Sequence, residues 1–276
     1  MFRIKGKLFC DLNPACYAIS MKKEHIKRHI KDFVSKEKIA KTYMNEKLPN
    51  VAWEHHSNMI KRAPGVDLTH QLNKADNIEL AGNKISGIII RPGEVFSFWK
   101  TVGKITRRRG YKDGRIIKKN KLVAGVGGGL CNLGNTLHLL ILHSPLEVTE
   151  FHKHSDALAP DEGPRVPFAA GTSVCYNHID YRFRNNTDQN IQIIVWRNGE
   201  DLHAELRSER EFDCNYELIE EDHHFKKEGE KFYRNSMIYR NVTDKKTGSV
   251  RKELIHNNHS EVMFDYSLIP GELVRE

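Results

Sequence analysis

The chain has 276 residues, of which 39% are hydrophobic and 29% charged, and its formal net charge is +8. This length allows one large domain or two small ones with a sizeable core. No segment approaches the roughly 20 apolar residues that span a bilayer, and no signal-peptide pattern follows the basic start, so we expect a cytoplasmic protein. The positive charge favours acidic partners such as nucleic acid, an anionic membrane or polymers that carry carboxylates. No nucleic-acid-binding motif is present, so nucleic acid is not an expected partner.

The cysteines do not form a disulfide framework. There are five, an odd number, and they are widely spaced, which indicates a reducing compartment. Cys10 and Cys16 lack the second pair that a structural zinc site needs. We interpret all of them except Cys131 as ordinary small apolar residues.

The N-terminal part contains one basic helix. After an irregular lead-in over residues 1–20, a helix is expected from Met21 to about Met44. Its apolar residues fall at helical spacing, with Lys and Arg on the other face: Ile26, Ile30, Phe33 and Val34. Such a helix usually docks on its own domain through the apolar face, and a second interpretation is peripheral contact with an anionic membrane. Residues 46–68 are predicted to be a connector.

The middle of the chain alternates helices and short strands. The pattern predicts a helix over Thr69–Lys84 that buries Leu72, Ala75 and Ile78, then strands at 88–90 and 95–99. A basic hairpin or long loop over 101–126 leads to a helix from Cys131 to about His143, which stops before Pro145.

The rest of the chain reads as strands. They are expected at 147–152, 173–183 and 190–196, with a hairpin turn at Asn198-Gly199, and at 231–239 and 249–255 with a turn at 245–248. The predicted fold class is therefore α+β, one mixed domain with mostly antiparallel strands. Its parts are a basic helical arm over 1–68, the main domain over 69–212 and a β-rich extension over 213–276.

The segment Gly127-Gly128-Gly129-Leu130-Cys131-Asn132 is the strongest candidate site. Glycines let backbone N–H groups approach a ligand, and a helix start adds unpaired donors and a partial positive charge. A thiol at that position should have a lowered pKa and be a better nucleophile.

Cysteine catalysis also needs a base. His152 and His154 would share one face of a strand that follows the helix, and Asp156, Asp161 or Glu162 could orient an imidazole. The same His-x-His with Cys131 could instead bind zinc, and a purely structural role for all of them is a third interpretation. We predict no metal and no cofactor.

Several blocks in this region resemble the VanW family, named for an accessory protein of B-type vancomycin-resistance clusters. The resemblance covers about residues 70–207. It is carried by five ordered groups of residues: 77–81, Arg91 to Phe98 (RPGEVFSF), 127–132 (GGGLCN), His154-Ser155, and Asp180 to Asn185 (DYRFRN). Val102-Gly103 and Gly110-Tyr111 fit intermediate blocks.

The resemblance implies a VanW-type domain and a link to glycopeptide resistance and cell-wall metabolism. Some relatives look like cysteine-dependent L,D-transpeptidases. By position, this implies Cys131 as nucleophile and His154 as base. Substrate binding is then expected at Gly127, Gly128, Gly129, Asn132 and Ser155.

The chain departs from the family pattern at two places. Asn132 stands where the family usually has glutamine, and Gly171-Thr172-Ser173 stands where it often has a Gly-x-Asp block. The leading hypothesis is acyl transfer through Cys131 on peptidoglycan stem peptides or their precursors. The rival is a non-catalytic accessory module that binds cell-wall precursors or resistance enzymes.

Overall fold

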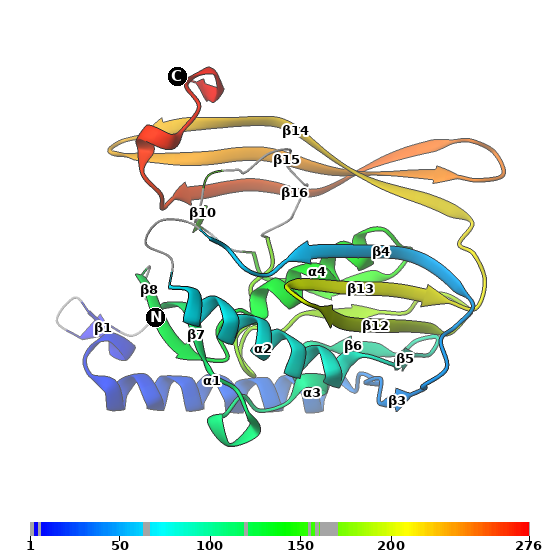
Figure 1. Cartoon of the computed structure of the whole chain (residues 1–276), viewed down its shortest axis with the longest axis horizontal. Helices are drawn as coiled ribbons and strands as arrows, with labels where there is room; N and C mark the ends of the chain where they lie inside the picture. The colour runs from blue at the N-terminus through cyan, green and yellow to red at the C-terminus, as the bar shows by residue number, and fades with distance from the viewer. Residues whose placement is uncertain are drawn as a thin grey trace.

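The computed structural model describes residues 3–4, 7–62, 67–118, 121–153, 156–157, 160 and 171–275. Helices α2 (Leu68–Ile85) and α4 (Leu130–Leu142) pack beside each other on a central sheet, and a C-terminal sheet lies over α4 (Figure 1). The predicted α+β class is confirmed. No helix among the described residues is both long and apolar enough to cross a bilayer. The boundaries at 68/69 and 212/213 stay predictions.

The central sheet has five antiparallel strands in the order β3-β5-β12-β13-β4. Their bounds are Thr42–Tyr43, Ile88–Ile90, Ile191–Asn198, Asp201–Ser208 and Asn50–Asn58. The hairpin predicted at Asn198-Gly199 joins β12 to β13, with Asn198 opposite Asp201. The connector predicted over 46–68 is wrong, because β4 is a nine-residue edge strand that pairs with β13. Its exposed residues mix apolar Val51 and Trp53 with polar Glu54, His56 and Asn58, so the sequence carried a weak strand signal.

A small sheet joins two of the sequence blocks quoted above. β6 (Val95–Ser97) pairs with β11 (Arg182–Arg184), which pairs with β9 (Glu147–Glu150). The predicted strand over 95–99 ends early at Ser97, whose hydroxyl caps helix α3 (Phe98–Val102) by accepting from the Lys100 N–H. The strand predicted over 173–183 is also shorter than expected, since only its last residues belong to β11.

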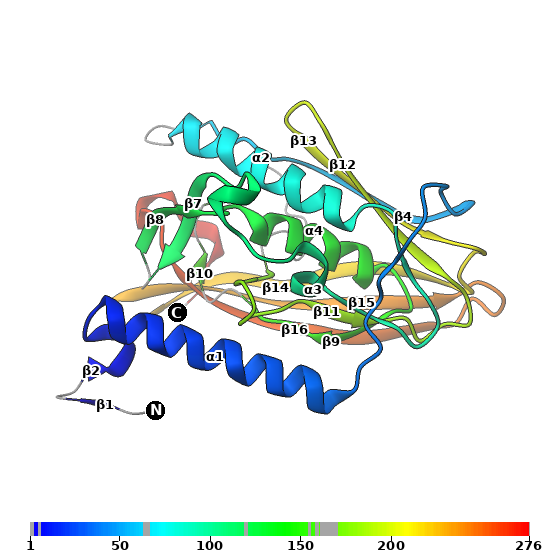
Figure 2. The ribbon, with the colours of Figure 1, turned by 90° about the horizontal axis from the view of Figure 1, so that it is seen from below.

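Helix α1 (Pro14–Ser35) begins earlier than predicted, because Asn13 accepts the Cys16 N–H and Pro14 occupies the first turn. It lies along the outer edge of the molecule (Figure 2). It docks on its own domain, as expected, but through charged side chains and not through its apolar residues. The side that meets the domain carries Arg28, which is buried, and Asp32.

Helix α2 is confirmed over nearly its predicted length, and the Asp67 carboxylate caps it. Its buried face holds Ala75, Ile78 and Ile85, as the spacing predicts, but Leu72 is exposed. Before α4, a hairpin of β7 (Asp113–Lys118) and β8 (Lys121–Val126) confirms the hairpin prediction for this region.

The C-terminal sheet contains three long strands, β14 (Cys214–Glu228), β15 (Lys231–Asp244) and β16 (Val250–Val262). β15 and β16 were predicted but are longer than expected, and β14 was not predicted as a strand. Short strands β10 (Asp156–Ala157) and β17 (Val274–Arg275) extend it. Leu139 and Leu142 of α4 pack against Ile238 of β15. The Arg240 guanidinium donates to the carbonyls of Leu142 and Ser144 at the C-terminal end of α4. A positive charge at that end stabilises a helix.

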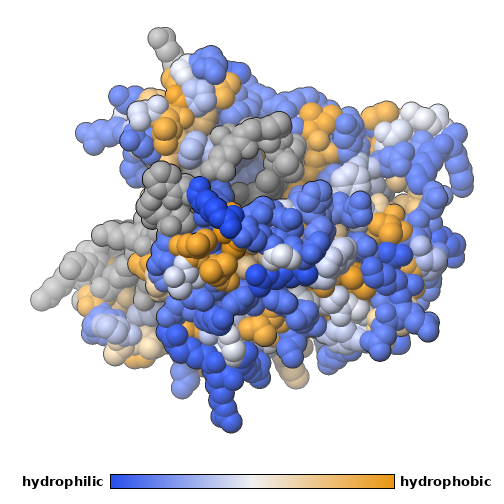
Figure 3. Space-filling view, in the orientation of Figure 1, coloured by the Kyte–Doolittle hydropathy of each residue, from blue (hydrophilic) through white to orange (hydrophobic). Residues whose placement is uncertain are grey.

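The remaining elements are small. A two-stranded pair, β1 (Arg3–Ile4) and β2 (Lys7–Leu8), precedes α1. Short 3₁₀ turns occupy 9–11, 107–109, 266–268 and 271–273. In the orientation of Figure 1 the surface is mostly hydrophilic, with apolar residues in separate patches (Figure 3).

Candidate functional site

The glycine triplet forms a tight bend between β8 and α4. Gly127 and Gly129 have φ of +78° and +102°, which glycine adopts without strain. A Cβ on Gly128 would lie 2.3 Å from the carbonyl carbon of Gly114 in β7, so the two backbones are in direct contact. Buried Asn77 of α2 donates to the Gly128 carbonyl and to the Lys112 carbonyl. The triplet is therefore required for packing, whatever else it binds.

Two of the glycine N–H groups already have acceptors. The Gly127 N–H donates to the Lys112 carbonyl, and the Gly128 N–H donates to the Gly125 carbonyl. The donors that a ligand could use are those of the first turn of α4, where Leu130 and Cys131 have no intrahelical acceptor by position. The N–H groups without a helical acceptor therefore lie one or two residues after the glycines themselves.

Cys131 lies in the first turn of α4, as predicted, and is partly buried against the main core. Its Sγ contacts the Val174 carbonyl oxygen at 3.6 Å, with the thiol as donor. Burial raises the pKa of the Cys131 thiol, and the contacts with Val174 and Ser173 offset only part of that effect. The prediction of a lowered pKa is wrong, because loss of water around the sulfur outweighs the hydrogen bonds that lower the pKa.

The segment that contacts Cys131 is paired with the segment that leads to the predicted base. The Ser173 N–H donates to the His152 carbonyl, and Lys153 forms an antiparallel bridge with Thr172. His154 and Ser155 follow directly in the chain but lie outside the described residues, as do Asp161 and Glu162.

The remaining candidates divide between two places. His152 Nε2 lies 3.1 Å from Glu150 Oε1, so this imidazole belongs to an ion-pair cluster on β9. Asp156 is in β10, paired with β16 of the C-terminal sheet. Among the residues that the structure describes, no group of three His, Cys, Asp or Glu side chains could hold a metal ion.

Two amides of α4 face the same region. Asn135 Oδ1 accepts the N–H groups of Gly171 and Thr172, which fixes that segment against the helix. Asn132 Oδ1 is buried, and it has no hydrogen-bond partner among the residues that the structure describes. An unpaired buried carbonyl oxygen is costly, so Asn132 is a place where a ligand donor would be stabilised.

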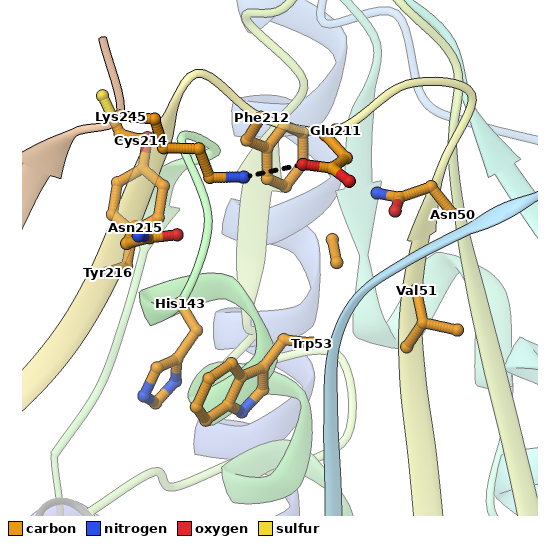
Figure 4. A pocket seen from close by; sticks show the side chains of 11 residues that line it. Asn50, Val51, Trp53, His143, Glu211, Phe212, Cys214, Asn215, Tyr216 and Lys245 are labelled. Carbon is orange, nitrogen blue, oxygen red and sulfur yellow. Dashed lines mark hydrogen bonds and ion pairs between the residues drawn. The ribbon is translucent and has the colours of Figure 1, made fainter.

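A separate cavity of about 390 Å³ lies at the other end of α4, between β4 and the start of β14. The indole of Trp53 stacks on the imidazole of His143, with centroids 3.7 Å apart. Figure 4 shows this pair on one side of the cavity and the Lys245–Glu211 ion pair, 3.1 Å between Nζ and Oε2, on the opposite side. Burial raises the pKa of Tyr216, which also lines it, to about 12, so this hydroxyl stays protonated.

The sequence did not indicate this cavity, because its residues come from four separate segments. His143 follows Cys131 by twelve positions, which is about 18 Å along a helix axis. The cavity therefore does not serve the cysteine.

Residues 73–207, about half of the chain, match the family model described as VanW like protein. The chain belongs to the VanW family. It is 26% identical over 226 residues to the Vancomycin B-type resistance protein VanW of Enterococcus faecalis, and the match covers 82% of each chain. It is 34% identical over 127 residues to the uncharacterized protein YoaR of Bacillus subtilis, covering 46% of this chain and 40% of that protein. No solved structure matches the chain.

Most VanW-family blocks in this chain hold the fold together. The block at 91–98 pairs through β6 with the block at 180–185 through β11. Asp180 accepts hydrogen bonds from Ser97, Trp99 and Arg182. Asn185 donates to the carbonyls of Ile90 and Gln189. The block at 127–132 is the one that also carries a thiol, Cys131, in the first turn of a helix.

Proposed function

We propose that this VanW-family protein acts in cell-wall metabolism linked to glycopeptide resistance, and that Cys131 carries out acyl transfer on peptidoglycan stem peptides or their precursors. The name of the Enterococcus faecalis relative supports the link to vancomycin resistance. The observation that carries the chemical part is the position of Cys131. Its thiol lies in the first turn of α4 and contacts the 173–174 segment, which pairs with residues 152–153 directly before His154.

The proposed reaction has two steps. His154 accepts the Cys131 proton, and the thiolate attacks a peptide carbonyl carbon, forming a carbon–sulfur bond. The first-turn N–H groups of α4 stabilise the negative oxygen, and the leaving amine takes the proton back as the carbon–nitrogen bond breaks. A second amine, or water, then attacks the thioester and releases Cys131.

Intact-mass analysis after incubation with a stem peptide tests this mechanism. Wild type should gain the mass of the acyl group, Cys131→Ala should not, and Cys214→Ala, which removes another partly buried thiol, should behave like wild type. Absence of an adduct on wild type, or its persistence in Cys131→Ala, would refute acyl transfer through this thiol.

A second candidate function is a non-catalytic binding module. Two observations favour it: the raised pKa of the Cys131 thiol, and the aromatic cavity at the far end of α4. Binding there predicts that Trp53→Ala weakens stem-peptide affinity in calorimetry whereas Cys131→Ala does not.

Iodoacetamide rates separate the two candidates. Acyl transfer requires Cys131 to react faster than Cys175 and Cys214 despite its burial. The binding module requires it to react more slowly than Cys175, which is exposed.

A further inference from the structure

Helix α1 presents a stripe of apolar side chains to solvent. The exposed fractions are Ile19 59%, Ile26 51%, Ile30 58%, Phe33 86% and Val34 68%. Their spacings of seven, four, three and one residue put them on one face of the helix. We call this set the α1 stripe. Solvent-exposed helix faces are normally polar, so a stripe of this kind indicates a surface that something else covers.

The opposite face of α1 is fixed to the domain by charge. Arg28 forms a two-pronged ion pair with Glu150 and donates to the His178 carbonyl. Asp32 accepts from Arg182 at 2.6 Å and pairs with Lys100 at 2.7 Å. These side chains lie about half a turn around the helix from the stripe, so the docked helix displays the stripe without rearrangement.

Lysines accompany the stripe along its length. At 100° per residue, Lys22 lies on one border, Lys27 on the other, and Lys23 beside Ile19 and Ile26, all exposed. Lysine stems extend along an apolar surface while their ammonium groups reach a charged layer. The helix carries a net charge of +3 and the chain +8.

The apolar stripe and the lysines beside it together favour one kind of partner. A second copy of the chain would set the same lysines against each other, which is unfavourable. An anionic lipid surface offers negative headgroups to the lysines and an acyl layer to the apolar side chains. The 22-residue helix is about 33 Å long and lies on the outer edge of the molecule (Figure 2).

We propose that α1 docks the protein on an anionic membrane, with the α1 stripe inserted at the level of the headgroups and Lys22, Lys23 and Lys27 paired with lipid phosphates. This goes beyond the proposed function and does not depend on Cys131.

Flotation with vesicles tests the proposal on the full chain. Wild type should bind phosphatidylcholine vesicles that contain 30% phosphatidylglycerol, bind vesicles of phosphatidylcholine alone at least tenfold more weakly, and lose binding in 0.5 M salt. Ile30→Ser with Phe33→Ser should lower partitioning at least a hundredfold, about tenfold for each large apolar group.

The matched control is Val250→Ser with Leu254→Ser, which removes two apolar side chains of β16 that are 62% and 58% exposed. It should bind like wild type, and circular dichroism should show that both variants are folded. The proposal is overturned if wild type ignores anionic vesicles at low ionic strength, or if the two double variants bind equally. It is also overturned if wild type is a dimer that does not bind vesicles and the stripe variant is a monomer, because the stripe would then be a dimer interface.

Discussion

Replacing Arg28 with methionine should destabilise the protein strongly, because Arg28 neutralises a buried carboxylate. The side chains of Arg28 and Glu150 are 7% and 9% exposed, and their second hydrogen bond measures 2.6 Å from Nη1 to Oε2. Methionine keeps much of the volume but leaves the Glu150 charge without its main partner. Breaking one side of a buried ion pair typically costs 3–5 kcal/mol, and we expect about 3 kcal/mol because Lys31 and His152 still contact Glu150.

The pH dependence supplies a second measure of the same contact. Burial alone would raise the pKa of the Glu150 carboxyl, but hydrogen bonds from Arg28 and His152 outweigh it and lower the pKa from 4.5 to about 2. The folded pKa is depressed, so the stabilisation is present above pH 4.5 and is lost as the pH falls toward 2. A shift of this size corresponds to about 3 kcal/mol, the same order as the expected cost of the substitution.

Urea unfolding between pH 7 and pH 2.5 tests both numbers. Arg28→Met should have a lower midpoint at pH 7 and a flatter pH dependence below 4.5 than wild type. Arg62→Met is the matched control, since Arg62 makes the same kind of pair with Glu200 at the surface, where the charges are solvated. Equal midpoints for the two variants, or an unchanged acid slope in Arg28→Met, would refute the assignment of this pair as the main attachment of α1.

Three further predictions concern packing around α4. Gly128→Ala should cost about 2 kcal/mol or more in urea unfolding because its Cβ meets the Gly114 backbone, whereas Gly271→Ala, which meets nothing within 4 Å, should be neutral. Arg240→Ala should speed hydrogen exchange in the last turn of α4 with little effect on its first turn. Burial lowers the pKa of His138 to about 3, so NMR should show a neutral imidazole from pH 8 to pH 5. The contribution of His138 to stability should fall as the pH drops below 6.5, because the unfolded chain then binds a proton that the folded protein does not. A ring that titrates near 6.5 would contradict the buried geometry.

Local patterns predicted those elements whose burial follows a simple period. Ala75, Ile78 and Ile85 repeat at helical spacing and face the core in α2, and Asn198-Gly199 gives the β12–β13 hairpin. In both cases the information lies within one short segment.

The same reasoning failed where distant residues decide. Arg28 is buried because it forms an ion pair with Glu150, which is 122 positions away in the chain. The apolar residues of α1 therefore face outward. A periodicity argument assigns charged residues to solvent and apolar residues to the core, and it cannot see a buried ionic partner. Strand β4 was missed for a related reason. Most of its residues are polar and do not predict a strand, and it is a strand because it pairs with β13.

The position of Cys131 at a helix start could be predicted, but the direction of its pKa could not. The helix start is a local feature, whereas the burial that raises the pKa comes from packing against the main core, which local sequence does not reveal. The comparison of those two effects requires the packed structure.

A continuous set of contacts connects the outer helix to the candidate cysteine. Arg28 of α1 binds Glu150, and Glu150 contacts the His152 imidazole. The His152 carbonyl accepts the Ser173 N–H, and Ser173 contacts the Cys131 thiol. The ion pair between Arg28 and Glu150 therefore holds both α1 and β9, the strand that precedes the predicted base His154 in the chain.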